Sequence, residues 1–360
     1  GLMLLAGCDY NQVAPYPASV PTLTVTPNTY GYAPLTAEVE LATTMPVQVE
    51  VVVAGRGTAD ELRHRFPSVS QQARLPILGL YPGFDNTITL RFLDAGGTLV
   101  GEVKRTITTP PLLRDLPSIA INTATPAAMK PGMNLVSYFG HDGQVTPQRP
   151  FIFDADGAIR WYLDFRSHPN LANLFYDDGV ERLANGNLYF GDGSTGRIIE
   201  MDMLGRIVRA WAMPGYGFHH EVLEKPNGNF LVTVNKNGAA TVEDYLIEID
   251  RATGAILHEW NLNQSLDYTR RSWPTSFGDQ NVDWFHANGL AYDPQDDAII
   301  VSGRTQGVVK LTNANKVVWI LAPHRGWAAA GDGTDLTTRL LQPLDAAGQP
   351  ITDPAVLEGT

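Results

Sequence analysis

The chain has 360 residues, of which 44% are hydrophobic and 18% are charged, and its formal net charge is −12. This length is sufficient for two domains with a sizeable buried core. The acidic balance argues against nucleic acid as a partner, because phosphate binding needs a basic face. The 34 glycines and 25 prolines are spread along the chain, which predicts many tight turns rather than a disordered tract.

The first eight residues, GLMLLAGC, form an apolar run that ends in small residues before Cys8. Cys8 is the only cysteine, so no disulfide can form within the chain. The tetrapeptide that ends at Cys8 resembles the lipobox of bacterial lipoproteins, in which the cysteine becomes acylated. We interpret residues 1–8 as the remnant of a lipoprotein signal and lipobox, with lipidation at Cys8, and expect the sequence to begin part-way through that signal. A buried cysteine after an ordinary hydrophobic start is the alternative.

Residues 9–26 are rich in Pro and Thr and are interpreted as a tether that leads away from a membrane surface. No later stretch approaches the roughly 20 apolar residues that a membrane-spanning helix needs. We therefore predict a periplasmic protein that is lipid-anchored to a membrane. The sequence leaves open whether this is the inner or the outer membrane.

Residues 20–112 are predicted to form an N-terminal β-sandwich domain, followed by a linker over residues 113–132. Short runs rich in Val, Thr and Ile alternate with turn signals such as Pro82-Gly83 and Gly96-Gly97, a pattern typical of that fold. The predicted strands are Thr22–Pro27, Ala37–Leu41, Val47–Val53, Thr87–Phe92 and Thr98–Thr108.

From residue 133 to 360 the sequence repeats. Four segments place a tryptophan in a β run that follows a turn, with spacings of 50, 49 and 59 residues; the tryptophans are Trp161, Trp211, Trp260 and Trp319. The later three are preceded by another turn and strand, in LANGNLYFGD, KPNGNFLVTV and DPQDDAIIVS. A unit of three or four strands with a period near 50 is typical of a β-propeller blade.

The predicted fold class is therefore all-β, with a β-sandwich followed by a β-propeller. A propeller ring closes when its last blade meets its first, but only four units and the start of a fifth are visible. We therefore expect an incomplete propeller, with the chain truncated at its C-terminus.

Two motifs place histidine at corresponding points of neighbouring blades. His219 and His220 lie in GFHHEV and His286 lies in DWFHANGL, each motif just before an inner strand, while Arg304 follows a strand in VSGRTQG. Such positions converge on the central channel of a propeller. Imidazoles with a guanidinium suit a tetrahedral oxyanion, because arginine offers forked donors and histidine can transfer a proton or act as a nucleophile.

The alternative interpretation is that these histidines are structural residues at strand ends. The remaining histidines are interpreted as structural, with His258 in a tryptophan-bearing strand, His64, His141 and His168 in turns or loops, and His324 after a blade strand. Clustered histidines could bind zinc, but no H-x-x-x-H or cysteine spacing supports a site. We predict no metal and no cofactor.

The segments GFHHEVLEKPNGNFLV, NVDWFHANGLAYDPQDDAIIVSGRTQGVVKL and WILAPHRGW resemble blades of bacterial arylsulfate sulfotransferases, which do not depend on a sulfate-carrying nucleotide. The resemblance extends to the N-terminal domain and implies a six-bladed propeller with histidines and one arginine lining its channel. By motif, His286 and Arg304 carry over. Either His219 or His220 supplies another member, with His220 favoured because it directly precedes an acidic residue. Asn288 resembles a supporting donor.

The resemblance also implies the reaction, a ping-pong transfer of a sulfuryl group from an aryl sulfate to a phenol through a sulfated histidine. In that family the nucleophilic histidine lies in a later Trp-, Gln- and His-containing motif. No such motif stands between His324 and Thr360, so we expect the nucleophile beyond residue 360. Relatives are often dimers, so a homodimer is a further expectation.

Two other functions remain open from the sequence. DRATGAILHEW (250–260) resembles the repeat of quinoprotein dehydrogenases, although the other units lack its Thr-Gly pair. A non-catalytic, lipid-anchored propeller scaffold is the other alternative, because fold alone does not fix function. An absorbing cofactor would favour the first, and a channel without clustered His and Arg would favour the second.

Overall fold

The structure is a computed structural model that describes residues 20, 22–57, 61–139, 147–175, 179–272 and 282–359. Cys8, His141 and most of the predicted tether lie outside the described residues. The chain divides into two compact units: unit 1 comprises Gly1–Asn134 and Phe151–Leu163, and unit 2 comprises Leu135–Pro150 and Asp164–Thr360. In the described part of the chain no helix is both long and apolar enough to cross a membrane.

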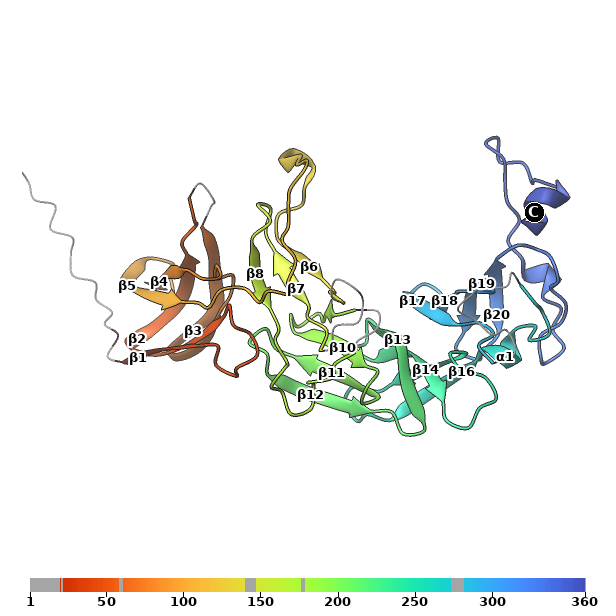
Figure 1. Ribbon diagram of the computed structural model, residues 1–360, viewed down its shortest axis with the longest axis horizontal. Coiled ribbons are helices and arrows are strands. Elements are labelled where there is room, and N and C mark those ends of the chain that lie inside the picture. The colour runs from red at the N-terminus through yellow and green to blue at the C-terminus, as the bar shows by residue number, and fades with distance from the viewer. Residues whose placement is uncertain are drawn as a thin grey trace, which may run out of the picture. The chain divides into compact units, whose positions relative to one another are not determined.

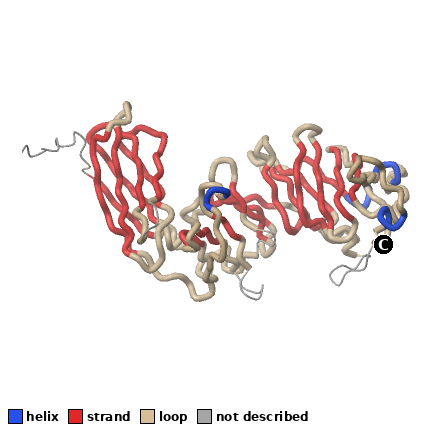
Figure 2. The backbone as a smooth tube through the Cα atoms, turned by 90° about the horizontal axis from the view of Figure 1, so that it is seen from above, coloured by secondary structure: helices blue, strands red, loops and turns tan. Residues whose placement is uncertain are grey.

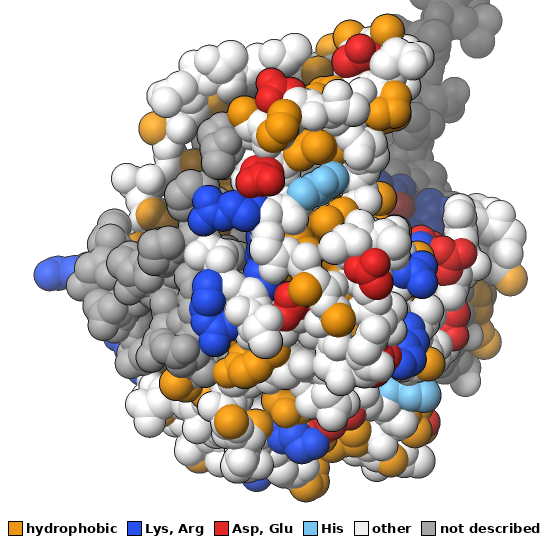
Figure 3. All heavy atoms as spheres, turned by 90° about the vertical axis from the view of Figure 1, so that its right-hand side faces the viewer, with side chains coloured by type: hydrophobic (Ala, Val, Ile, Leu, Met, Phe, Trp, Pro, Cys, Tyr) orange, Lys and Arg blue, Asp and Glu red, His pale blue; other side chains and the backbone are white. Residues whose placement is uncertain are grey.

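The predicted all-β class is confirmed. Strands make up almost all of the regular structure, and the helical pieces are short (Figures 1 and 2). These helical pieces are η1 (Pro126–Ala128), α1 (Leu262–Ser265), η2 (Thr337–Arg339) and α2 (Pro354–Glu358). On the face drawn in Figure 3, Lys and Arg side chains lie among acidic and hydrophobic ones.

Unit 1 contains one continuous five-stranded antiparallel sheet. Its strands are β1 (Thr22–Pro27), β2 (Ala37–Val53), β3 (Leu62–Ile77), β4 (Asp85–Leu93) and β5 (Leu99–Thr108). The two runs predicted at Ala37–Leu41 and Val47–Val53 are one long strand. The register of β2 against β3 shifts between Ala42 and Val47. Before this shift β2 pairs with β1, and after it β2 pairs with β4.

Strand β3 was missed by the sequence prediction. It lies at the edge of the sheet, pairs with β2 alone among the described strands, and is mostly exposed. Its composition is therefore polar and lacks the alternation that marks a half-buried strand. The prediction that His64 lies in a loop is wrong for the same reason, because His64 is part of β3.

A row of alternating charges crosses this sheet. The buried carboxylate of Glu50 on β2 contacts Arg63, Arg65 and Arg91, and Arg91 in turn lies 3.7 Å from Glu102 on β5. Burial opposes ionisation of Glu50, but its hydrogen bonds to the three arginines outweigh burial and lower the pKa of its carboxyl group. The row therefore joins β3, β2, β4 and β5 through side chains as well as through backbone pairing.

Three short strands follow: β6 (Asn134–Val136), β7 (Phe151–Phe153) and β8 (Ile159–Tyr162). β7 and β8 form a hairpin within unit 1. The buried Arg160 of this hairpin donates from Nε to the Gly79 carbonyl at 3.0 Å, pairs with Asp154 at 2.7 Å and lies 3.6 Å above the Tyr81 ring. The predicted domain boundaries at residues 112 and 133 stay predictions.

Unit 2 contains three successive four-stranded antiparallel sheets, which we call blades A, B and C. Blade A has β9 (Glu181–Arg182), β10 (Leu188–Asp192), β11 (Arg197–Met201) and β12 (Ile207–Ala212). Blade B has β13 (Tyr216–Glu224), β14 (Phe230–Lys236), β15 (Tyr245–Ile249) and β16 (Ile256–Asn261). Blade C has β17 (Ala287–Asp293), β18 (Ala298–Gly303), β19 (Gly307–Thr312) and β20 (Val317–Leu321).

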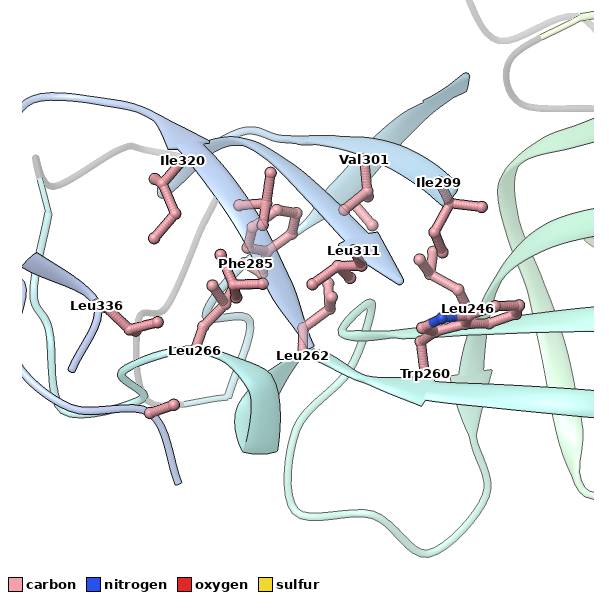
Figure 4. Packing of buried hydrophobic residues seen from close by; sticks show 14 of the residues in the cluster. Leu246, Trp260, Leu262, Leu266, Phe285, Ile299, Val301, Leu311, Ile320 and Leu336 are labelled. Carbon is pink, nitrogen blue, oxygen red and sulfur yellow. The ribbon is translucent and has the colours of Figure 1, made fainter. Parts of the chain in front are cut away.

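Blade B is buried on both faces because neighbouring blades cover it. Phe230 and Val232 of β14 pack in a cluster with blade A, while Leu231 between them packs in a cluster with blade C. Successive side chains of a strand point to opposite faces, so a continuous apolar run supplies both interfaces. Figure 4 shows the second cluster, in which Trp260 and Leu262 meet residues of blade C.

In each blade a polar side chain at the connection from the first strand to the second contacts a charged side chain of the third strand. In blades A and B an asparagine of the N-G-N turn donates its side-chain amide to a glutamate of the third strand. In blade C the polarity is reversed, and a lysine of the third strand donates to an aspartate. The pairs are Asn187–Glu200 at 2.6 Å, Asn229–Glu248 at 2.8 Å and Lys310–Asp293 at 2.7 Å.

The tryptophan repeat consists of two kinds of position. Trp211 and Trp260 donate from Nε1 to backbone carbonyls of the next blade, those of Arg251 and Thr312, each at 2.9 Å. Trp161 and Trp319 stand two positions closer to their turns. The prediction that each tryptophan lies in a strand after a turn is confirmed for all four. The residues still lie on the same side of their strands, because side-chain direction repeats every two residues.

Candidate active site

The site is built at the first strands of blades B and C, where both strands are irregular. The register shifts between Phe218 and Val222 in β13, and between Ala287 and Gly289 in β17. His220 and His286 have φ angles of 50° and 56°, a left-handed conformation that is unfavourable for residues with a side chain. Bulges re-aim side chains and occur frequently beside active sites.

The structure brings all three predicted histidines together. The ring centroids of His219 and His220 are 4.1 Å apart, and the ring centroid of His286 lies 5.2 Å from that of His219 and 5.6 Å from that of His220. His219 and His286 are buried, whereas His220 is half-buried. His286 immediately precedes β17, as predicted, but His219 and His220 lie within β13 rather than before it.

Two carboxylates that the sequence analysis missed contact this cluster. Asp283 Oδ2 lies 2.7 Å from Nδ1 of His286. Glu243 Oε2 contacts the same nitrogen and lies 3.2 Å from Nε2 of His219. Asp283 carried a signal, because it stands three residues before His286 in the same motif. Glu243 carried none, because it lies between β14 and β15 and only the packing of blades B and C brings it to the histidines.

The backbone of His286 is held by the neighbouring blade. Oδ1 of the buried Asp244 accepts hydrogen bonds from the amides of Phe285, at 2.8 Å, and His286, at 3.4 Å. The Ala287 amide donates to the Glu243 carbonyl at 2.9 Å. The segment that carries His286 is therefore fixed to the β14–β15 connection.

Arg304 follows directly after β18, as predicted, and its amide donates to the His286 carbonyl at 3.0 Å. Its side chain is exposed, and its positive charge acts on His219. Gly303 lies under the ring of Phe285. A Cβ at Gly303 would stand 2.5 Å from that ring and 2.7 Å from the Phe285 carbonyl oxygen, so only glycine permits this approach.

Asn288 lies in β17 at its register shift. Its Oδ1 is buried and has no hydrogen-bond partner among the described residues. Glu221 of β13 links this strand to β17, because its Oε2 accepts a hydrogen bond from the Leu290 amide at 2.7 Å. A small pocket beside the cluster is lined by Gly179, Glu181, His220, Glu221 and Val222.

The three histidines do not share one protonation state. Burial lowers the pKa of His219 to about 2, and the positive charges of His220, His286 and Arg304 act in the same direction. Burial also opposes protonation of His286, but its hydrogen bonds to Asp283 and Glu243 outweigh burial and raise its pKa to about 9. At neutral pH the site therefore holds a neutral imidazole beside an imidazolium.

His286 Nε2 is buried and has no hydrogen-bond partner among the residues that the structure describes. In an imidazolium this nitrogen carries a proton, so the site presents an unused, charged donor. A buried donor of this kind is costly unless a bound group accepts its hydrogen bond.

The ligand types of a metal site are also present. One nitrogen of each of His219, His220 and His286 lies within 4.8 Å of the others, and Glu243, Asp283 and His286 form a second such group. Zinc prefers such nitrogen and oxygen ligands. The expectation of no metal stays a prediction.

The other described histidines lie elsewhere. His258 is in β16, as predicted, and its ring lies 5.7 Å from that of Trp260 at an interplanar angle of 45°. Nδ1 of His168 accepts hydrogen bonds from two backbone amides in its turn. Nε2 of His324 lies 3.0 Å from the Leu341 carbonyl. These contacts agree with the structural interpretation of His258, His168 and His324.

Comparison with known proteins gives one consistent result. A family model described as arylsulfotransferase (ASST) matches residues 119–353, and one described as the arylsulfotransferase Ig-like domain matches residues 24–110. Arylsulfate sulfotransferase AssT of Escherichia coli O6:H1 (strain CFT073) is 29% identical over 417 aligned positions, and the match covers 90% of this chain and 67% of that protein. The protein of the same name from Lelliottia amnigena is 28% identical over 407 residues, with the same coverage.

Among solved structures, a Bacteroides caccae protein of unknown function is 13% identical, with a TM-score of 0.36, and the match covers 76% of this chain and 94% of that one.

Proposed function

The chain belongs to the arylsulfotransferase family, and we propose that it transfers a sulfuryl group from an aryl sulfate to a phenol. The reaction follows a ping-pong scheme with a sulfated histidine as intermediate. No soluble cofactor is needed, because phenols, with a pKa near 10, are good enough leaving groups. The quinoprotein and scaffold alternatives are not favoured by these relatives.

One observation carries the assignment of the site: the unused Nε2 donor of His286 lies in a cluster with two further imidazoles and the nearby guanidinium of Arg304. A sulfuryl group in transfer collects negative charge on its oxygens and on the leaving oxygen. Fixed cationic donors stabilise such charge without reorganising at the moment of reaction. We assign this role to His286 and Arg304.

The two half-reactions balance as follows. The S–O bond of the aryl sulfate breaks while an N–S bond forms on the attacking imidazole, and the phenolate leaves with the electron pair and takes a proton. The acceptor phenol then loses its proton and forms a new S–O bond, while the N–S bond breaks. The attacking imidazole is not assigned to the three histidines described here, because the family resemblance predicts it in a downstream motif.

Proton transfer is assigned to His286 and His220. The raised pKa of His286, about 9, is close to that of a phenol, near 10, and this match favours a general acid that protonates the leaving phenolate. His220 lines the small pocket and can receive the proton of an acceptor phenol bound there. Buried His219 stays neutral, so it lies beside the charged His286 without adding a charge of its own.

The test is transfer from 4-nitrophenyl sulfate to phenol by the full-length protein, followed by release of 4-nitrophenolate. Loss of one preorganised donor costs about 10²–10³-fold in turnover, so His286→Ala and Arg304→Ala should each lose activity on this scale. Lys316→Ala serves as the control, because Lys316 pairs with Asp332 on the surface. Unaltered rates in both site variants would remove these roles from His286 and Arg304.

We also propose that the protein is periplasmic and held to a membrane by a lipid on Cys8, and that it forms a homodimer. The support for the anchor is the small-residue run before Cys8, and the support for the dimer is the family resemblance. Mass spectrometry of the exported protein tests the acylation, and an unmodified Cys8 would contradict it.

A further inference from the structure

The two carboxylates at the histidine cluster have no role in the transfer as assigned so far. We propose that Glu243 and Asp283 are positioning residues: they hold Nδ1 of His286 from one side and so direct Nε2 toward the reacting sulfuryl group. This inference rests on the proposed sulfuryl transfer for its catalytic meaning. Its structural content, which is the hold on His286, can be tested without activity.

The carboxylates come from two different blades. Asp283 lies in the segment that leads into β17, and its Oδ2 is 2.7 Å from Nδ1 of His286. Glu243 lies between β14 and β15 and contacts the same nitrogen from the blade B side. An imidazole whose Nδ1–H is directed to a carboxylate has a defined orientation, and its other nitrogen is directed away from the carboxylate.

Glu243 is itself rigidly placed. Its φ angle is 63°, which is unfavourable for a glutamate and persists only where the surroundings enforce it. Its amide donates to Oδ1 of Asn235 at 2.7 Å, and its carbonyl accepts from the Ala287 amide at 2.9 Å. The backbone of Glu243 is thus tied both to its own blade and to the residue after His286. Strain held in this way is typical of functional sites.

Glu243 also serves two histidines with one oxygen. Its Oε2 lies 3.2 Å from Nε2 of His219 while it contacts Nδ1 of His286. The two rings therefore lie around one carboxylate oxygen. Because one carboxylate can balance only one added proton well, the shared contact favours a single imidazolium in this pair.

The charged groups around His286 divide into two sets. Glu243, from the β14–β15 connection, and Asp283, from its own segment, favour the cation. Burial of the ring opposes it, and so do the positive charge of Arg304 after β18 and a proton on His220 of β13, whereas neutral His219 adds no charge. Both carboxylates touch the ring, whereas the Arg304 side chain is exposed to solvent, and the balance keeps His286 protonated at neutral pH, in agreement with its pKa of about 9.

The first experiment follows the imidazole of His286 by ¹⁵N NMR as pH is raised, in the full chain and in Glu243→Gln and Asp283→Asn. Removal of one contacting opposite charge shifts a pKa by about 1–3 units. We therefore expect His286 to lose its proton about 1–3 pH units lower in each variant, and the population with the proton on Nδ1 to fall. Glu259→Gln is the matched control, because the contacts described for Glu259 are with Lys236 and Tyr216.

The second experiment measures the pH profile of turnover with 4-nitrophenyl sulfate. Activity needs protonated His286, so the alkaline limb should fall near pH 9 in the natural protein and 1–3 units lower in the variants. At pH 8, a fall in pKa from about 9 to about 7 lowers the protonated fraction about tenfold, and kcat should fall by the same factor. At pH 6 the Glu243→Gln variant should recover most of its kcat, which a merely misfolded variant would not do.

The outcomes separate the inference from the proposed function. If His286 titrates at the same pH in the natural protein, in Glu243→Gln and in Asp283→Asn, the carboxylates do not hold it and the inference is wrong, whatever the activity. If the NMR shifts occur but the natural full-length protein transfers no sulfate, the hold on His286 stands and the proposed function fails. A loss of kcat that is equal at every pH would also overturn the inference.

Discussion

Replacement of Asp244 tests whether the packing of blade B against blade C places the candidate site. Oδ1 of this buried side chain accepts hydrogen bonds from the amides of Phe285 and His286. Asp244→Ala leaves both donors buried without a partner, at a cost of about 1–3 kcal/mol each. The bond to the His286 amide is long at 3.4 Å, so we expect a total cost of about 2–4 kcal/mol.

This loss should be local, because it falls on the segment that carries His286. Amide hydrogen exchange reports such local opening, and a cost of about 2–4 kcal/mol corresponds to a fall of about 30- to 1,000-fold in protection at Phe285. Asp244→Asn keeps an oxygen acceptor at the same place, so its protection should not fall more than about tenfold below that of the natural protein. If the alanine variant exchanges no faster, or the asparagine variant falls as far as alanine, the reasoning is wrong.

The pH dependence of stability provides a second test of Asp244. Burial raises the pKa of Asp244 to about 6, although hydrogen bonds from the Phe285 and His286 amides oppose that shift. The folded state therefore holds this proton more tightly than the unfolded chain, whose aspartates titrate near 3.9. Stability from Asp244 is present at low pH and is lost as pH rises through about 6. Asp244→Asn lacks this loss and should gain stability, on the order of 3 kcal/mol above pH 6, relative to the natural protein.

Two further changes test the architecture. Trp260→Phe removes the indole donor to the Thr312 carbonyl and should lower the free energy of unfolding of unit 2 by about 1–3 kcal/mol in urea titrations. Trp319→Phe should cost less, because Trp319 is half-buried and no such hydrogen bond is described for it. Equal losses would contradict the bridging role of Trp260. Gly303→Ala should displace Phe285, because the added Cβ would stand 2.5 Å from its ring. We expect kcat of the full-length protein to fall at least tenfold and its melting temperature to fall by several degrees. A fully active variant would show that Phe285 can move without harm to the site.

Much of the fold could be predicted because its signals are local. The turn-and-strand units of blades A, B and C recur along the chain, and their apolar runs correspond to strands buried on both faces. Strand β3 could not be found in the same way, because it is exposed at an edge and contains Pro67 and Pro76. The positions of the tryptophans relative to their turns were visible in the sequence, but their hydrogen bonds to the next blade were not.

The site residues also differ in whether the sequence carries a local signal for them. His219, His220, His286 and Arg304 could be predicted because equivalent strand positions in adjacent blades converge, and repeats reveal equivalence. Glu243 could not, because its place depends on a left-handed backbone turn and on the contact between two blades. Sequence patterns identify residues that share a position in the repeat. They do not identify a residue that enters the site from a connection which each blade builds differently.

The reversed polarity of the contact in blade C has a consequence for how the repeats can be exchanged. A glutamate stands on the third strand of blades A and B, but Lys310 stands there in blade C and faces Asp293. A chimaera that paired the turn of blade C with the third strand of blade B would bring Asp293 against Glu248, two carboxylates with no cation between them. The contact thus distinguishes blade C from blades A and B, and mispairing between blades B and C during folding, a common failure of repeated architectures, meets an electrostatic penalty here.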